Sequence, residues 1–317
     1  MYYDRRIPAE FLDLLQPGAA LGWVVPWLST DAASSAGAHV QTRRDRHGRK
    51  HGSIQIYLGR TSPLEVRGRS RGRLRLHADR FYQAMTPHLF ARDVEPAALA
   101  ALAPDLIAHV ERAAEQTHRS FLDGEAVVHA GLMRHYGPLA RGEAPWLALD
   151  SEARVGFASR ADQVAFEAAL SRAVGLPTTE SMPRKLDLVA TDQQARLLLV
   201  EVKADATGLA RAAWQGAVHV ARFRSLLAEH PAWFSEVLGD LARDKAGVGL
   251  LGRSRLPGFN GAPTPTPVIA APDERADWHS AWRREIAPVM EASRGHLGGL
   301  RLWRLNADGQ VLEEVTA

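Results

Sequence analysis

The chain has 317 residues, of which 46% are apolar and 24% are charged, and its formal net charge at pH 7 is +3. This composition is ordinary for a folded globular protein and excludes a disordered or fibrous chain. The chain contains no cysteine, which excludes disulfides and thiolate-bound zinc. No apolar run reaches the length of a membrane span and no signal-like apolar core follows the N-terminus, so we expect a cytoplasmic protein that does not bind membranes.

The first 144 residues are expected to form an α+β module. The hydrophobic pattern predicts, in chain order, a helix over 8–15 and strands over 21–28, 53–58 and 72–78. Trp23 and Trp27 are expected in the core of this module. A helical region follows over 95–136, and the Gly- and Pro-rich stretch 136–145 predicts a domain boundary after residue 144.

This module carries a strong local excess of positive charge. Residues 41–80 have a net charge of +9, so the rest of the chain sums to −6. Such an excess suits a polyanion, because phosphates attract basic groups without regard to sequence. The alternative is a solvated, arginine-rich surface. If the surface binds nucleic acid, the predicted contact residues are Arg43, Arg44, Arg46, Arg49, Lys50, Arg73 and Arg75.

The second half of the chain is expected to contain a buried β-hairpin with charged ends. The segments 186–190 and 196–203 read as two strands joined by a polar turn. Since side chains alternate along a strand, Glu201 and Lys203 point to the same face. Pairing of the two strands brings Asp187 beside Glu201, so two carboxylates and one amine meet at one end of the hairpin.

These residue types suit a divalent metal ion and a water nucleophile. Mg²⁺ and Mn²⁺ prefer oxygen ligands, and Mg²⁺ often binds through only one or two carboxylates. A bound metal lowers the pKa of a water, and Lys203 would orient or deprotonate that water or stabilise developing charge. The chain has only four lysines against 35 arginines, so a lysine ending its most apolar strand is unexpected. The alternative is an exposed ion pair between Glu201 and Lys203.

A helix is predicted over 159–174, before the hairpin. Ser159 and Asp162 form an N-cap signature at its start. Glu167 shares the apolar stripe of this helix with Leu170, where an unpaired carboxylate is costly and a metal ion would be a partner. The alternative is an edge residue whose carboxylate reaches water or an arginine.

The order Asp187, then Glu201-Val202-Lys203, resembles the PD-(D/E)XK nuclease superfamily over roughly residues 155–271. The resemblance implies an α/β fold with a restriction-endonuclease-like αβββαβ core, within a domain spanning 145–317. It also implies hydrolysis of phosphodiester bonds with Mg²⁺ or Mn²⁺, with DNA rather than RNA as the expected substrate. Members often carry a glutamate on the helix before the hairpin, so Asp187, Glu201 and Glu167 would hold the metal.

RecB-like members of this superfamily carry Gln-x-x-x-Tyr on the helix after the lysine. The corresponding residues here are Gln215 and His219, with histidine in place of tyrosine. The proline that names the motif does not directly precede Asp187, because the nearest is Pro183. Gln215 would orient the water or hold a phosphate. The candidate catalytic residues are therefore Asp187, Glu201, Lys203, Gln215 and Glu167.

The sequence is also compatible with two other functions. A non-catalytic nucleic-acid-binding or assembly module that keeps the nuclease fold is the alternative function, and turnover of a small phosphorylated ligand is a third. A homodimer is compatible with the sequence, and defence or DNA repair is a plausible setting.

The later elements are predicted as a helix to 229, strands 248–251 and 268–270, a helix 273–294, and a hairpin of 300–305 with 310–315.

Overall fold

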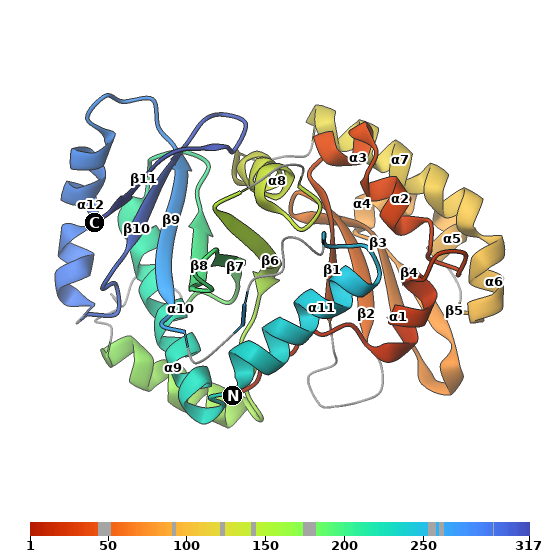
Figure 1. The fold of residues 1–317 in the computed structure, drawn as a ribbon, viewed down its shortest axis with the longest axis horizontal. Helices are drawn as coiled ribbons and strands as arrows, with labels where there is room; N and C mark the ends of the chain where they lie inside the picture. The colour runs from red at the N-terminus through yellow and green to blue at the C-terminus, as the bar shows by residue number, and fades with distance from the viewer. Residues whose placement is uncertain are drawn as a thin grey trace.

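The protein is a mixed α/β chain whose strands form two neighbouring sheets (Figure 1). The computed structural model describes residues 1–43, 52–90, 93–120, 124–140, 144–173, 182–252, 258–259, 263–293 and 295–317. Within them, a five-stranded sheet comes from the N-terminal half and a six-stranded sheet from the C-terminal half. The predicted boundary after residue 144 therefore falls between the two sheets.

The first sheet is an antiparallel meander whose strand order, β1-β2-β3-β4-β5, follows the chain. Around β4, Leu74 and Leu76 are buried while Arg73 and Arg75 are exposed, which is the predicted alternation. The strand that ends at Arg43 and the strand that begins at Ser53 pair antiparallel. The strands are β1 (Ala38–Arg43), β2 (Ser53–Leu58), β3 (Thr61–Gly68), β4 (Leu74–His77) and β5 (Asp93–Val94).

Short helices and one long helix cover this sheet, with α7 against β3, α3 against β1 and α5 against β4. Their bounds are α1 (Ala9–Leu15), α2 (Val24–Leu28), α3 (Asp31–Ser35), the 3₁₀ turn η1 (Ser70–Gly72), α4 (Arg80–Met85), α5 (Pro87–Phe90), α6 (Pro96–Ala101) and α7 (Ala103–Ser120). The helix predicted over 8–15 is therefore present as α1.

The strand predicted over 21–28 is wrong, because this segment forms a turn followed by α2. The buried side chains are Leu21, Val24, Trp27 and Leu28, and their spacing of three to four residues is helical. Trp27 is in the core as expected, whereas Trp23 is only partly buried. An apolar run without alternation does not distinguish a strand from a buried helix.

The second sheet combines an antiparallel meander with a parallel extension. β6, β7 and β8 pair antiparallel, β9 and β10 run parallel to β8, and β11 closes the edge antiparallel to β10. The crossovers between parallel neighbours pass through helices α10 and α12, as such connections require. The strands are β6 (Trp146–Ala153), β7 (Leu186–Asp192), β8 (Leu197–Val202), β9 (Thr266–Pro272), β10 (Arg301–Leu305) and β11 (Val311–Thr316).

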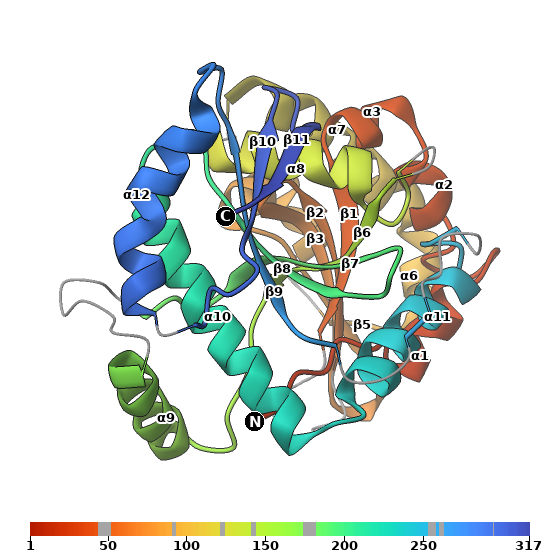
Figure 2. The same cartoon turned by 60° about the vertical axis from the view of Figure 1, so that its left-hand side comes forward.

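Helices cover both faces of this sheet (Figure 2). α10 and α12 pack together on one face, while α8 lies on the other, with its Leu132 in the same apolar cluster as Leu198 of β8. α8 thus precedes residue 144 but completes the core of the second sheet. The helices are α8 (Gly124–Tyr136), α9 (Arg160–Ala173), α10 (Leu209–Glu229), the π-helical turn η2 (Phe234–Leu238), α11 (Gly239–Gly247) and α12 (Trp278–Ala292).

Several predicted elements of this half are confirmed and one is wrong. The main-chain N–H of Asp162 donates to Ser159 Oγ at 3.1 Å, so α9 has the predicted N-cap. The final hairpin is present as β10 and β11. Residues 248–251 form no strand: Leu250 and Leu251 both donate their N–H groups to the Lys245 carbonyl oxygen in the turn that ends α11. Their apolar side chains are buried without strand pairing.

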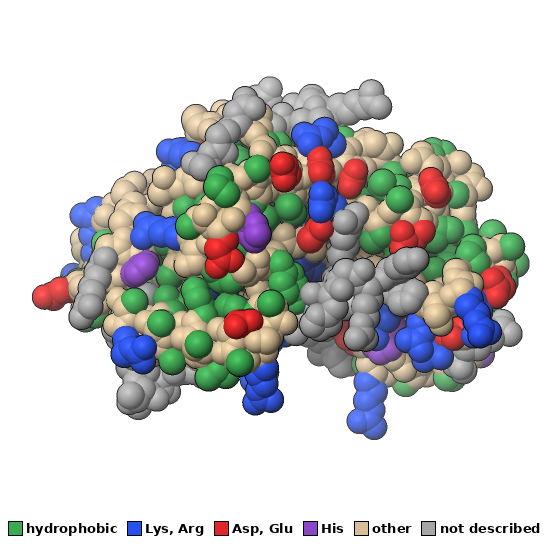
Figure 3. Space-filling model, turned by 90° about the horizontal axis from the view of Figure 1, so that it is seen from below, with side chains coloured by type: hydrophobic (Ala, Val, Ile, Leu, Met, Phe, Trp, Pro, Cys, Tyr) green, Lys and Arg blue, Asp and Glu red, His purple; other side chains and the backbone are tan. Residues whose placement is uncertain are grey.

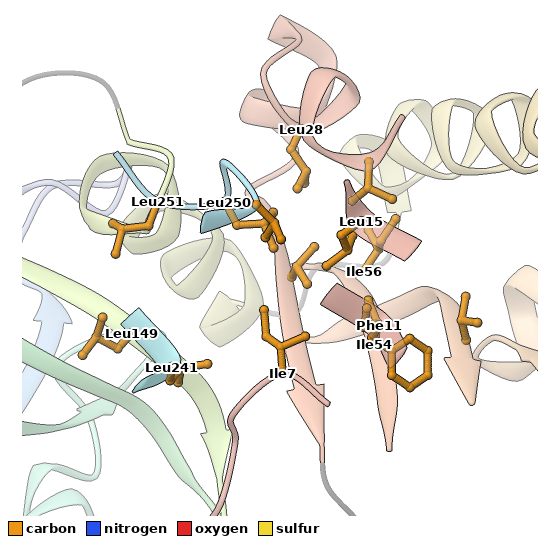
Figure 4. Close-up of a cluster of buried hydrophobic side chains, with 14 of the residues drawn as sticks. Ile7, Phe11, Leu15, Leu28, Ile54, Ile56, Leu149, Leu241, Leu250 and Leu251 are labelled. Carbon is orange, nitrogen blue, oxygen red and sulfur yellow. The ribbon is translucent and has the colours of Figure 1, made fainter. Parts of the chain in front are cut away.

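One apolar core runs through both halves. Figure 4 shows Ile7 of the N-terminal segment next to Leu241 of α11, and Ile54 of β2 and Leu149 of β6 belong to the same buried cluster. The N-terminal segment also binds the second sheet directly, because Arg5 donates to the main-chain oxygen of Glu152 at 2.9 Å. The two sheets are therefore held in a fixed relation by a shared core.

Among the helices of the described ranges, none combines the length and the apolar character that crossing a bilayer requires.

Candidate active site

The β7–β8 hairpin brings the two predicted carboxylates and the predicted lysine to one end of the six-stranded sheet. Leu188 pairs with Val200, so the same register places Asp187 across from Glu201. Lys203 follows β8 directly, and its Nζ lies 3.8 Å from Glu201 Oε2. The three side chains that the sequence singled out therefore converge.

Asp187 is almost fully buried and holds its carboxylate between two partners. Its Oδ2 accepts a hydrogen bond of 2.8 Å from the main-chain N–H of Val202. Its Oδ1 faces Nη2 of Arg60 at 3.9 Å. Burial raises the pKa of Asp187, while Lys203, the Val202 N–H and Arg60 act in the opposite direction. Oδ2 is thus bound to the backbone, Oδ1 faces the Arg60 guanidinium, and the carboxyl also hydrogen-bonds the Glu201 side chain.

Glu201 is only 2% exposed and lies on the face that α10 covers. Its Oε1 is 3.3 Å from Nε2 of His219, yet neither atom makes a hydrogen bond within the described residues. Burial and the neighbouring Asp187 raise the pKa of Glu201 well above its usual range, and burial lowers the pKa of His219 to about 3. Unsatisfied buried polar atoms are costly, so an additional atom bound here would be stabilised.

Lys203 is fixed by a residue that the sequence analysis did not select. Its Nζ donates to the main-chain oxygen of Val202 at 3.0 Å and to Glu125 Oε1 at 3.3 Å. Glu125 is the second residue of α8, where the helix dipole favours a carboxylate. β6 is the first strand of the antiparallel meander, and the helix before it is α8. A search for a glutamate on the helix before the first of three strands would therefore have pointed to Glu125.

Glu167 was predicted as a metal ligand, but its contacts correct that assignment. Its Oε1 accepts from Nη2 of Arg222 at 3.1 Å and from Nε2 of Gln163 at 3.0 Å. The helix that carries it, α9, is inserted between β6 and β7. The ion pair with Arg222 is the second of the two alternatives for Glu167, and it anchors α9 to α10.

A third carboxylate, that of Glu152 on β6, lies across from Asp187 on the neighbouring strand. Ser151 and Ala153 of β6 pair with residues of β7 on either side of Asp187, so Glu152 lies across from it. Glu152 has φ of +52°, a left-handed conformation that is unusual for a residue with a side chain. Its Oε1 lies 3.4 Å from Nε of Arg60, and its Oε2 pairs with Lys185. Burial raises the pKa of Glu152, but Lys185 and Arg60 outweigh it and the pKa is lowered.

Of the predicted pair on α10, His219 is buried and Gln215 is partly buried. Gln215 and His219 are four residues apart and share one face of the helix. His219 reaches Glu201 as described, and the side-chain oxygen of Gln215 is buried without a hydrogen-bond partner among the described residues. Gln215 therefore keeps an acceptor free on the same helix face.

The donor set fits a hard divalent cation. Asp187 and Glu201 offer carboxylate oxygens, and no thiolate is available because the chain has no cysteine. Across the described ranges, no group of three or more histidine, aspartate and glutamate side chains is already arranged to hold a metal ion. Two carboxylates nevertheless suffice for Mg²⁺ when water and substrate phosphate complete its shell.

The predicted basic face is only partly within the described residues. Arg43 donates to the Tyr57 hydroxyl at 2.6 Å, and Arg75 pairs with Asp93, whereas Arg73 is exposed. Figure 3 shows one face of the molecule, on which acidic and basic side chains are interspersed over both halves. The other predicted contact residues, Arg44, Arg46, Arg49 and Lys50, lie outside the described residues.

Buried histidines between the sheets predict a loss of stability in acid. Burial lowers the pKa of His39 to about 3 and that of His129 to about 4. The unfolded chain binds a proton at each histidine below about pH 6.5, whereas the folded protein does not, so stability falls as pH falls. From pH 7 to pH 5 we expect the two residues together to remove about 4 kcal/mol, measured by urea unfolding.

The variant His39→Gln isolates this effect from other titrating groups. His39 bonds the Gly37 oxygen through Nδ1 and Ser151 Oγ through Nε2, at 3.1 and 2.9 Å, and an amide replaces part of this bonding. The loss between pH 7 and pH 5 should shrink by about 2 kcal/mol relative to wild type. The control is His88→Gln, on an exposed surface. An equal pH dependence of wild type and His39→Gln would contradict the prediction.

The site thus combines residues that sequence reasoning found with residues that it missed. Asp187, Glu201 and Lys203 are close in sequence, so a local pattern reveals them. Glu125, Glu152 and Arg60 come from α8, β6 and the turn between β2 and β3, and only the fold brings them to the hairpin. Comparison of the chain with protein-family models, curated proteins and solved structures finds no match.

Proposed function

We propose that the protein is a divalent-metal-dependent nuclease that hydrolyses phosphodiester bonds, with DNA as the preferred substrate. The observation that carries the proposal is the convergence of Asp187, Glu201 and Lys203 at the end of the β7–β8 hairpin. A buried pair of carboxylates beside an ammonium group is the chemistry that the PD-(D/E)XK resemblance implies. The unsatisfied Glu201 Oε1 supports a missing positive partner at this position.

The order of elements around the hairpin also supports the proposal. α8, β6, β7, β8, α10 and β9 occur in the order helix, three strands, helix, strand, with α9 inserted after β6 and with η2 and α11 inserted between α10 and β9. That order matches the αβββαβ core that the resemblance implies. With α8 as the first helix, Glu125 rather than Glu167 takes the position of the helix glutamate.

The residues divide the reaction between them. Asp187 and Glu201 would hold Mg²⁺ or Mn²⁺, which supplies Lewis-acid stabilisation of the phosphate and a more acidic water. Lys203 offers three N–H donors beside this position and stabilises negative charge on the water or on the phosphate. A bond forms between the water oxygen and phosphorus, the bond from phosphorus to one sugar oxygen breaks, and the water proton passes to the leaving oxygen. Gln215 holds the phosphate or orients the water.

A second candidate function has its own support. Lys203 is paired with Glu125, and Arg60 is paired with three carboxylates, so every cation of the site already has an acidic partner. A non-catalytic module that keeps the nuclease fold and binds nucleic acid would retain such ion pairs as structure. The two functions differ in one respect: only the enzyme requires a metal ion at Asp187 and Glu201.

The test is a cleavage assay with purified full-length protein. Linear, circular and single-stranded DNA, together with RNA, are incubated with Mg²⁺, with Mn²⁺ or with EDTA. We expect cleavage of DNA that depends on the added metal and stops with EDTA. Binding of DNA without cleavage under every metal condition would replace the nuclease with the binding module.

The basic face makes a separate prediction about binding. Arg73 is exposed beside β4, so replacing it with alanine should remove one phosphate contact and leave the fold intact. We expect the slope of log K against log salt to fall by about 1, equally for DNA of any sequence. Fluorescence anisotropy with labelled DNA from 50 to 200 mM salt measures this slope. Arg283→Ala, on α12 of the other half, is the matched control, and equal slopes for Arg73→Ala and wild type would exclude Arg73 from the interface.

A further inference from the structure

Arg60 reaches the candidate active site from the other sheet. It occupies the two-residue turn between β2 and β3, where Leu58 pairs with Thr61. The preceding Gly59 has φ of +57°, which this tight hairpin turn needs and which glycine adopts without strain. The position of Arg60 is therefore set by the first sheet and not by a long loop.

The guanidinium group of Arg60 is surrounded by carboxylates from three elements. Nη1 pairs with Glu125 Oε2 of α8, Nε lies 3.4 Å from Glu152 Oε1 of β6, and Nη2 lies 3.9 Å from Asp187 Oδ1 of β7. Guanidinium remains charged at any pH at which the protein folds. It thus supplies positive charge to all three carboxylates, in addition to Lys203 at Glu125 and Lys185 at Glu152.

The contact with Asp187 bears directly on metal binding. Since Asp187 Oδ2 already accepts the Val202 N–H, Oδ1 is the oxygen that remains for a cation. That oxygen is the one that faces Arg60. A divalent ion bound to Oδ1 would lie close to a fixed positive charge, and the two repel in a partly buried site. The side chain of Arg60 is 33% exposed, so it has room to move away.

We propose that Arg60 is a built-in competitor of the metal ion, through which the N-terminal sheet controls metal loading of the site. The inference rests on the proposed function, because it assigns the metal to Asp187 and Glu201. Before a metal ion binds, the positive charge of Arg60 offsets the repulsion between the carboxylates. When the ion binds, Arg60 turns away from Asp187. A phosphate of bound nucleic acid is the anion toward which it would turn, since guanidinium binds phosphate well.

The test measures Mn²⁺ affinity by calorimetry on full-length protein without nucleic acid. Arg60→Gln and Arg60→Met remove the charge but keep most of the side-chain bulk, and we expect each to bind Mn²⁺ at least tenfold more tightly than wild type. Arg60→Lys, which keeps a charge on a shorter reach, should fall between. The control is Arg67→Gln, because Arg67 lies on the same sheet and, within the described residues, forms its ion pair with Glu65 and none with the site carboxylates.

The Mn²⁺-dependent rise in melting temperature provides a second readout, which should be larger in Arg60→Gln than in wild type. Equal or weaker Mn²⁺ affinity in both neutral variants overturns the inference, and so does a failure of every protein to bind Mn²⁺. The outcome is separable from that of the cleavage assay. A wild type that cleaves DNA while Arg60→Gln gains no affinity rejects the inference alone, and tighter Mn²⁺ binding without any cleavage rejects the nuclease alone.

Discussion

Replacing Lys203 with methionine should reduce the rate of DNA cleavage by about 10²–10⁴-fold while leaving DNA binding within a few-fold of wild type. Methionine keeps much of the buried stem but removes the ammonium, which lies 3.8 Å from Glu201 and 3.3 Å from Glu125. The loss should appear in single-turnover kinetics with saturating Mg²⁺, because the group acts on the reacting water or phosphate rather than on the affinity for the polymer.

A matched control lies on the same hairpin. Arg196 stands at its opposite end, where it pairs with Asp192 and is half exposed, so Arg196→Met should leave the cleavage rate within a few-fold of wild type. The fold of both variants is checked by thermal unfolding. Undiminished cleavage by Lys203→Met would remove the lysine from the mechanism, and an equal loss in Arg196→Met would show that the effect is structural.

Replacing Glu201 with glutamine should abolish metal-dependent cleavage and at the same time stabilise the metal-free protein. The carboxyl of Glu201 is buried beside Asp187, and both facts raise its pKa. When the pKa of a carboxyl is higher in the folded state than in the unfolded chain, the protein loses stability as pH rises through the folded-state pKa. The reason is that the unfolded chain ionises at lower pH and is therefore favoured. A neutral amide avoids this loss, and we expect a gain of about 0.5–2 kcal/mol, the range that single stabilising substitutions commonly reach.

The measurement compares melting temperatures at pH 8 with EDTA and with Mn²⁺. Glu201→Gln should melt higher than wild type in EDTA and should gain less from Mn²⁺. Glu167→Gln is the informative comparison, because Glu167 pairs with Arg222 outside the site, and its loss should lower stability without changing the response to Mn²⁺. If Glu201→Gln responds to Mn²⁺ as wild type does, the metal does not bind at Glu201.

The contrast between Glu167 and Glu125 shows where sequence reasoning stopped. The sequence favours Glu167 because its helix directly precedes the hairpin and because it lies on a predicted apolar stripe. The helix does precede the hairpin, but on that stripe Val164 is 58% exposed while Leu170 is buried. Glu167 is partly exposed and pairs with Arg222 of α10, and a sequence does not reveal which cation a carboxylate meets. Glu125 lies 78 residues before Lys203. It comes close because α8 packs against β8, the strand that Lys203 follows.

Local patterns succeeded where one residue-by-residue rule governs the structure. The alternation in β4, the N-cap at Ser159 and the β7–β8 hairpin depend on neighbours within a few residues. The errors at 21–28 and 248–251 are apolar runs without alternation, whose conformation depends on what they pack against. Trp27 is in the core as expected, but neither segment forms a strand.

The sequence by itself determined the chemistry at the end of the hairpin, since strand alternation and a short turn bring Asp187, Glu201 and Lys203 together whatever surrounds them. Only the tertiary structure decided which charges complete the site. Glu125, Glu152 and Arg60 belong to segments whose approach depends on the shared core between the sheets, and no periodicity encodes a contact between residues so far apart. Residue spacing sets the local geometry, whereas tertiary packing sets the balance of buried charge.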